Sequence, residues 1–239
     1  VVIGRPGGDV AGAEVDPGQV ADRRAVHDDR NRSTAGSAAR LERAYAAWLW
    51  PPGQDWSARI TGGWLEESFA GLDAELLWRP FASRLAAGIE VSHVWHRDPA
   101  AAIRLLPQDR LSGHLDLYYR PPLEGADIEM RVSVGRYLAG DIGGTAELAR
   151  ILPGGLRLSL FATATDRAEG RAGRFWGGLR LSIPLDGLRD IPAGTTAAVR
   201  VEPLLRNAGQ RLDAPLRLYE LTERAGYRAI TSGWNRLLD

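Results

Sequence analysis

The sequence of 239 residues contains no cysteine. Without cysteine the chain has no disulfide framework, no thiol nucleophile and no thiolate metal site. The sequence also lacks a run of about 18 consecutive apolar residues, which excludes a transmembrane helix. Membrane-spanning β-strands are short and apolar on only one face, so this absence does not exclude a transmembrane barrel.

Lysine and net charge are absent as well. All 30 basic residues are arginines, and 30 acidic residues balance them. The chain therefore has no overall field that would attract nucleic acid or an anionic membrane surface. We expect no nucleic-acid partner.

Alternation of polar and apolar residues is the main pattern that the sequence does contain. Residues 126–144 show it most clearly, with Ile128, Met130, Val132 and Val134 alternating against Glu129, Arg131, Ser133 and Tyr137. Successive side chains in a β-strand point to opposite faces, so this run predicts a strand with one apolar and one charged face. The charged face meets either the water around a soluble sandwich or the interior of a membrane barrel.

Similar runs recur along the chain from about residue 40. The predicted strands are Ala44–Trp50, Trp56–Glu66, Leu72–Arg79, Arg84–His96, Leu111–Arg120, Asp127–Leu138, Thr145–Leu152, Leu156–Asp166, Arg174–Leu185, Thr196–Arg206 and Leu216–Leu221. This pattern predicts an all-β, antiparallel up-and-down meander of about 10–12 strands. Residues 1–39 show little periodicity and are predicted to be a mobile loop or linker, whereas residues 40–239 form the β domain.

The connections between these strands are of two kinds. Compact turns that begin with proline, such as PPGQ, PFAS, PPLEG and PGG, alternate with longer polar segments, HRDPAAAIRLLPQDR, AGDIGG, RAEGRAG and NAGQRLDAP. In a meander every second connection lies at the same end, so one end has tight turns and the other has loops. Bacterial outer-membrane barrels have this asymmetry. The segment DGLRDIPAG breaks the pattern once, because it is long where a tight turn is expected.

Aromatic residues lie at the ends of the predicted apolar faces. Trp56 and Trp64 share a face and are eight residues apart, which is about 26 Å at roughly 3.3 Å per residue. This distance is close to the apolar band of an outer-membrane barrel, about 25 Å tall, with aromatic girdles at both interfaces. The predicted strands of 10 to 13 residues are also long enough to cross a bilayer, which needs about 9–11 residues. The sequence therefore favours an outer-membrane β-barrel, whole or incomplete within this chain, over a soluble sandwich with a core of the same aromatics.

Four stretches of the sequence resemble a known family: GWLEESFAGLDAELLWRPFASRLAAG, GRYLAGDIGGTAEL, LSIPLDGL and EPLLRNAGQRLDAPLRLYELT. In this order they are similar to the YjbH-type outer-membrane proteins of exopolysaccharide and group 4 capsule production, specifically to the C-terminal portion of these longer proteins. The resemblance implies a β-barrel in the bacterial outer membrane that assists export or assembly of a polysaccharide. It also implies the outer-membrane lipid and other proteins of the export machinery as partners, and it supplies no catalytic residues and no cofactor.

The polar face of the predicted strands is the candidate binding surface. Its members are Asp73, Glu75, Arg79, Arg84, Glu90, Asp116, Arg120, Glu129, Arg131, Tyr137, Arg157 and Arg180. Charges of both signs on neighbouring strands either pair across the sheet or line a path for a sugar chain. His93 and His96 fall on opposite faces, so no metal site is predicted.

Two other functions remain open at this point. A soluble, carbohydrate-binding β-sandwich predicts aromatic residues on one sheet face or one loop end. A membrane-embedded hydrolase predicts that Ser112, His114 and an acidic residue such as Asp116 converge within hydrogen-bond reach. The residues and the resemblance together favour a non-enzymatic role.

Overall fold

A computed structural model describes residues 43–98, 104–123, 125–152, 155–167, 174–184, 196–201 and 208–224. The predicted mobile segment, residues 1–39, lies outside these ranges. In the described part of the chain, no helix has the length and apolar character needed to span a bilayer.

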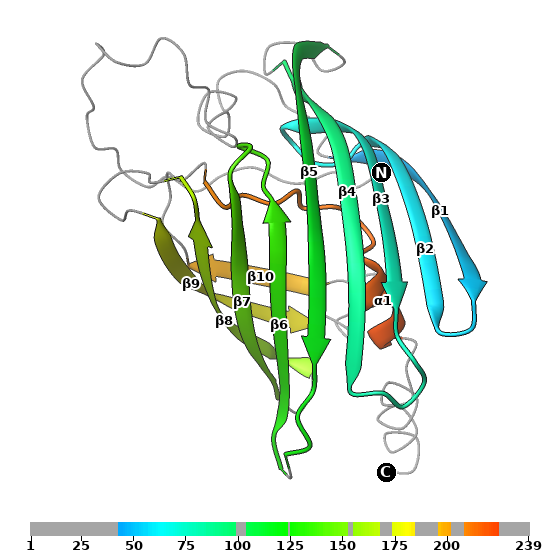
Figure 1. Cartoon of the computed structure of the whole chain (residues 1–239), viewed down its shortest axis with the longest axis vertical. Helices are drawn as coiled ribbons and strands as arrows, with labels where there is room; N and C mark the ends of the chain where they lie inside the picture. Colours follow the sequence, from blue (N-terminus) through cyan, green and yellow to red (C-terminus); the bar gives the residue numbers. More distant parts are fainter. Residues whose placement is uncertain are drawn as a thin grey trace.

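Across the ranges that the structure describes, ten strands form one sheet in which each strand is hydrogen-bonded to its neighbours in sequence (Figure 1). They are β1 (Ala44–Gly53), β2 (Trp56–Trp64), β3 (Phe69–Trp78), β4 (Leu85–Arg97), β5 (Leu105–Tyr119), β6 (Asp127–Arg136), β7 (Ile142–Ile151), β8 (Arg157–Thr165), β9 (Phe175–Pro184) and β10 (Thr196–Val201). Every pairing is antiparallel. The predicted antiparallel meander is therefore confirmed.

The start of β5 differs from the prediction. The segment 105–110 was predicted to belong to the long polar connection HRDPAAAIRLLPQDR, but it extends the ladder with β4 to the pair Arg97↔Leu105. Pro107 lies in this extension, where β5 pairs with β4 alone, since the ladder with β6 begins at Gly113. Pro107 also falls in the register shift between the pairs Trp95↔Asp109 and Arg97↔Leu105, and a bulge is a position where a strand tolerates proline.

The described sheet is curved but open. β1 pairs only with β2, and β10 pairs only with β9, among the residues described. The closed barrel is thus not confirmed. The strands also do not divide into two facing sheets, as a sandwich requires.

Residues 208–224, which we call the strap, lie inside the curve of the sheet. Figure 1 shows this segment in orange, crossing behind β5–β7 and ending in α1 (Leu218–Arg224). The prediction placed a loop at 207–215, and residues 208–215 indeed have no regular secondary structure. The predicted strand Leu216–Leu221 is wrong, because α1 begins at Leu218. We call the sheet face that meets the strap the concave face and the opposite one the convex face.

The helix replaces the predicted strand because of which side chains become buried. Leu218 and Tyr219 are adjacent in sequence and both are buried, whereas Glu220 is exposed. Neighbouring residues of a strand point to opposite faces, but a helix can direct both toward one side. The Leu218 N–H also donates to Glu75 Oε2 over 2.9 Å, so a carboxylate of β3 satisfies a free amide of the first helical turn.

Candidate functional site

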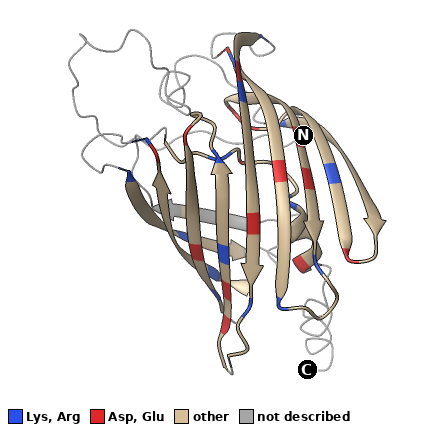
Figure 2. Cartoon of the chain, viewed as in Figure 1, with Lys and Arg blue, Asp and Glu red and all other residues tan. Residues whose placement is uncertain are grey.

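The two faces of the sheet have opposite polarity, and the exposed one is apolar. Large apolar side chains on the convex face are open to the surroundings, including Trp48 at 71%, Leu72 at 57%, Leu115 at 56% and Leu160 at 53% relative exposure. The concave face carries buried charged residues: Arg59, Asp73, Glu75, Glu90, Asp116, Glu129 and Glu147. Soluble proteins bury apolar residues and leave charges in water. In Figure 2, blue and red bands mark charged residues on neighbouring strands of the sheet.

Arg59 of β2 is the most deeply buried of these charges. It forms ion pairs with Asp73 and with Glu75, the latter over 3.0 Å between Nη2 and Oε2. Arg59 also donates to the carbonyl oxygen of Pro215 in the strap. Ser92 of β4 donates to Asp73 Oδ1 over 2.6 Å. A buried charge is tolerated only when it is paired and hydrogen-bonded, and this cluster meets that condition across three strands and the strap.

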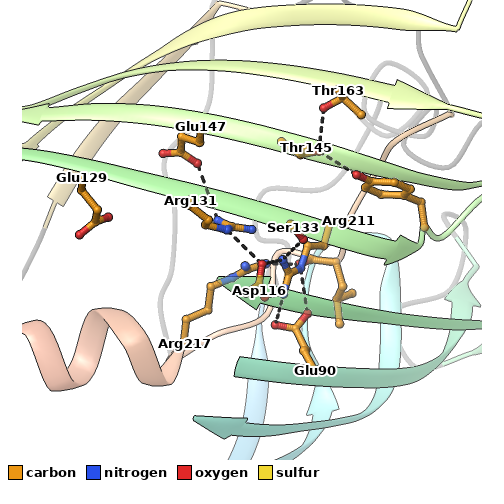
Figure 3. A network of polar contacts seen from close by, with 12 residues as sticks. Glu90, Asp116, Glu129, Arg131, Ser133, Thr145, Glu147, Thr163, Arg211 and Arg217 are labelled. Carbon is orange, nitrogen blue, oxygen red and sulfur yellow. Dashed lines mark hydrogen bonds and ion pairs between the residues drawn. The ribbon is translucent and has the colours of Figure 1, made fainter. Parts of the chain in front are cut away.

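Arg211 of the strap occupies the centre of the concave face (Figure 3). Its guanidinium donates to both carboxylate oxygens of Glu90, over 3.2 and 3.0 Å, and to both oxygens of Asp116, over 2.8 and 2.7 Å. A further hydrogen bond of 3.2 Å reaches Ser133 Oγ. Burial lowers the pKa of Arg211, but the two carboxylates outweigh burial and hold this pKa well above its ordinary value. The guanidinium is therefore permanently charged in the centre of the molecule.

Glu129 of β6 is a second meeting point of the network. Its carboxylate pairs with Arg157 over 2.6 Å and with Arg120 over 2.6 Å. The Tyr219 hydroxyl of α1 donates to the same carboxylate over 2.8 Å. Burial, and next to it the Glu129 charge, raise the pKa of the Tyr219 phenol. The Tyr219 ring stacks on Tyr118 with centroids 3.7 Å apart and planes at 5°, so this contact joins the polar network to an apolar cluster.

Arg131 connects these two parts of the network. It pairs with Asp116 over 3.1 Å and with Glu147 over 3.7 Å (Figure 3). Glu147 in turn lies 3.5 Å from Arg157 and 3.9 Å from Arg180. The ion pairs therefore form a continuous ladder of alternating sign from β4 to β9.

The strap is fixed at its beginning as well as along its length. The Gly209 N–H donates to Asp141 Oδ2 over 2.8 Å, and Gln210 accepts from the Leu138 N–H over 2.9 Å. Gly209 has a φ of 75°, and an added Cβ would lie 2.8 Å from Thr163 Cγ2. Glycine is therefore required here, both by the left-handed backbone and by the close approach to β8.

The structure brings most of the predicted site residues together. Eight lie on the concave face: Asp73, Glu75, Glu90, Asp116, Glu129, Arg131, Arg157 and Arg180. Arg79 and Arg120, at strand ends, both pair with Glu223 of α1. Tyr137 follows β6 and exchanges a hydrogen bond of 2.7 Å with Thr145. Arg84 precedes β4 and is exposed, apart from the buried network.

Several members of the network were missed by the sequence reasoning. Arg59 and Glu147 could have been found, because each lies an even number of residues from the polar residues of its own strand and so shares their face. Arg211 and Glu223 gave no such signal, since they lie outside the predicted strands, and Tyr219 was placed in the predicted strand Leu216–Leu221 rather than in a helix.

The residues of the hydrolase alternative share the concave face without forming a triad. Asp116 is held by Arg131 and Arg211. His114 packs edge-on against the Tyr137 ring, with centroids 4.8 Å apart, and its Nε2 has no hydrogen-bond partner among the described residues. No cluster of three or more His, Asp or Glu side chains suited to a metal occurs in the described ranges.

Comparison with known proteins identifies the family. The profile of the YjbH family, described as "Exopolysaccharide biosynthesis protein YbjH", matches residues 19–224. The chain belongs to this family. It is 35% identical over 175 residues to an Escherichia coli (strain K12) protein described as an uncharacterized lipoprotein YjbH. The match covers 71% of this chain and 25% of that relative, so the chain spans about a quarter of the relative's length. No solved structure matches the chain significantly.

Proposed function

We propose that this YjbH-family chain is a non-enzymatic wall of an outer-membrane β-barrel and assists export or assembly of an exopolysaccharide. The observation that carries this proposal is the reversed polarity of the sheet. Exposing a whole apolar sheet face to water would cost about 25 cal/mol for each Å². The same face in contact with lipid is stable, while the charged side chains pair inside, as they do in barrels with a polar interior.

Aromatic residues on the convex face support a membrane position. Trp56 and Trp78 are direct cross-strand partners at one end of β2 and β3. At the other end, Trp64 and Trp95 flank Ala70 on the same face. Two aromatic groups separated by aliphatic residues suit the two interfaces of a bilayer. The description of the E. coli relative as a lipoprotein agrees with a location in the cell envelope.

The centre of the concave face is filled by paired side chains, and this limits where a glycan could bind. The buried carboxylates already pair with arginines of the wall and of the strap, and displacing these partners would leave charges unpaired at a cost of about 3–5 kcal/mol each. We therefore expect polysaccharide contact at the exposed ends of the sheet, where Arg84 is available, rather than at the strap-filled centre.

The test is performed in a strain that lacks the native gene and is complemented with the intact protein. The protein should fractionate with the outer membrane, resist alkaline extraction and migrate heat-modifiably in a detergent gel. Release as a soluble protein would contradict the membrane proposal.

Polysaccharide secretion is measured in the same strain. Arg84→Ala is expected to reduce secretion severalfold at unchanged protein level. Arg136→Ala, at an exposed strand end on the other face, is the matched control and should leave secretion unchanged. Equal secretion by both variants would contradict the proposed glycan contact.

A further inference from the structure

The edge strand β1 departs from the polarity of the rest of the sheet. Its concave-face residues include Tyr45 and Leu49, which are apolar and remain 39% and 45% exposed. The corresponding positions of β2–β8 are mostly polar and covered by one another or by the strap. Trp48, on the convex side of β1, has 71% relative exposure. Both faces of β1 are thus apolar and uncovered in the described structure.

Among the described residues, no strand pairs with the edge of β1 that faces away from β2. The strand is AYAAWLWPPG and contains no charged residue. Edge strands that remain unpaired usually carry charges, bulges or prolines that prevent association. Here Pro51 and Pro52 protect one end, and the bulge lies beside them, between Trp50 and Gly53. The seven residues from Ala44 to Trp50 can still pair.

The sequence of this segment is complementary to itself. In an antiparallel pair of two copies, directly opposite residues must lie on the same face of the sheet. Only registers that pair odd-numbered with odd-numbered residues, and even with even, are therefore allowed. The register centred on Ala47 pairs all seven residues. It matches Ala44 with Trp50, Tyr45 with Leu49, Ala46 with Trp48, and Ala47 with itself. Each tryptophan then has an alanine opposite, so a large side chain meets a small one. Centring on Trp48 instead would bring Pro51 into the ladder opposite Tyr45, where proline has no N–H to donate.

We propose that β1 is the interface of a two-fold symmetric homodimer, in which the β1 strands of two copies pair antiparallel through Ala44–Trp50. The resulting contact is isologous, and it joins two ten-stranded sheets into one. It also continues the apolar convex face across the interface.

The alternative partner within the chain, β10, fits this edge less well. β10 contains six residues, Thr196–Val201. Its sequence includes Arg200, whose register partner on β9 is Arg180. Pairing with β10 would therefore bring a strand that contains a charged residue against β1, which contains none.

Disulfide crosslinking tests the proposed register. Because the chain contains no cysteine, only the introduced cysteines can crosslink. Ala47→Cys should form a dimer under mild oxidation, because directly opposed residues have Cα atoms about 4.5–5.5 Å apart, within disulfide range. Ala46→Cys is the matched control on the same strand. Its two copies are diagonal in this register, roughly 8 Å apart, and should crosslink at least fivefold less.

A second variant tests the dimer without oxidation. Ala47→Asp would set two carboxylates directly opposite each other at the two-fold axis, and this like-charge pair should convert the purified chain from twice its monomer mass to the monomer mass. Ala47→Asn adds a neutral side chain of the same shape at the same position and should leave the dimer intact.

Three outcomes would overturn the proposal: a monomeric wild-type chain, equal crosslinking at positions 46 and 47, or an intramolecular crosslink in the double variant Ala47→Cys/Ala198→Cys. The last would show that β10 closes the sheet. The readouts work in membranes, detergent or buffer, so failure of the dimer is distinguishable from failure of the membrane proposal.

Discussion

The same strands supply the residues of both the convex and the concave face, yet the two faces are stabilised by different surroundings. On β5, Leu115 and Leu117 point outward and remain 56% and 49% exposed, whereas His114 and Asp116 point inward and are buried. The convex face needs only an apolar environment. The concave face needs specific counter-charges, some of which come from a segment about 100 residues away in sequence. One face is therefore specified by composition and the other by individual contacts.

The largest expected effect comes from removing the central counter-charge. Arg211→Met should lower the free energy of unfolding by about 3–5 kcal/mol, because it leaves Glu90 and Asp116 buried without their guanidinium. Urea titration with tryptophan fluorescence measures this change.

The control for that effect removes the carboxylates too. Adding Glu90→Gln and Asp116→Asn to Arg211→Met should restore more than half of the loss, since neutral side chains need no counter-charge. A triple variant as unstable as the single one would show that packing of Arg211, rather than charge pairing, stabilises the concave face.

A charge placed on the convex face should cost less, and its cost should depend on depth. Leu115→Arg, in the interior of β5, is expected to destabilise the protein in lipid vesicles by about 2–4 kcal/mol. Leu85→Arg, beside Tyr119 at the strand end, should cost about 0–1 kcal/mol. Equal costs at the two positions would mean that no apolar slab surrounds the convex face.

A smaller change separates hydrogen bonding from stacking at the strap. Tyr219→Phe keeps the ring on Tyr118 but loses the hydrogen bond to Glu129, so it should cost about 1.5–3 kcal/mol. Tyr119→Phe removes a hydroxyl from the exposed convex face and should change stability by about 0.5 kcal/mol or less. The same urea titration compares the two variants, and equal effects would rule out a role for the Glu129 contact.

The smallest effect concerns pH at the beginning of the strap. Burial raises the pKa of Asp141 above its ordinary value of 3.8, and the Gly209 N–H only partly offsets this. Its protonated form is thus favoured by folding, and the contribution is complete below pH 3.8 and lost as pH rises through the folded-state pKa.

Asp141→Asn should therefore stabilise the protein relative to wild type most at neutral pH, and the advantage should shrink toward pH 4. Unfolding titrations of both proteins from about pH 4 to pH 7 would measure the difference. A stability difference that is constant over this range would contradict the raised pKa.

The strands could be predicted because side chains of a strand alternate between the two faces. The alternation of polar and apolar residues therefore indicates the face of each position. The concave positions of Asp73, Glu90 and Glu129 followed from that alternation alone. The helix α1 was missed because LRLYEL also alternates, and a seven-residue helix has little intrinsic stability. Its conformation depends on the Glu75 carboxylate and on Tyr118, both from distant strands.

Arg211 illustrates what the sequence could not reveal. Nothing near it in sequence alternates or repeats, and its partners are 121 and 95 residues away. A contact of this separation is a property of the folded chain and has no local pattern.

The position of the strap also sets an order for biogenesis. Ribosomes release β4 and β5 with Glu90 and Asp116 long before Arg211 exists, so during synthesis these carboxylates have no internal neutralising partner from the strap. The sheet must therefore stay hydrated, or be held by a chaperone, until residue 224 has emerged. Contacts of such high sequence separation fold slowly, and a nascent chain halted before Arg211 would lack the guanidinium that pairs with Glu90 and Asp116 in the folded structure.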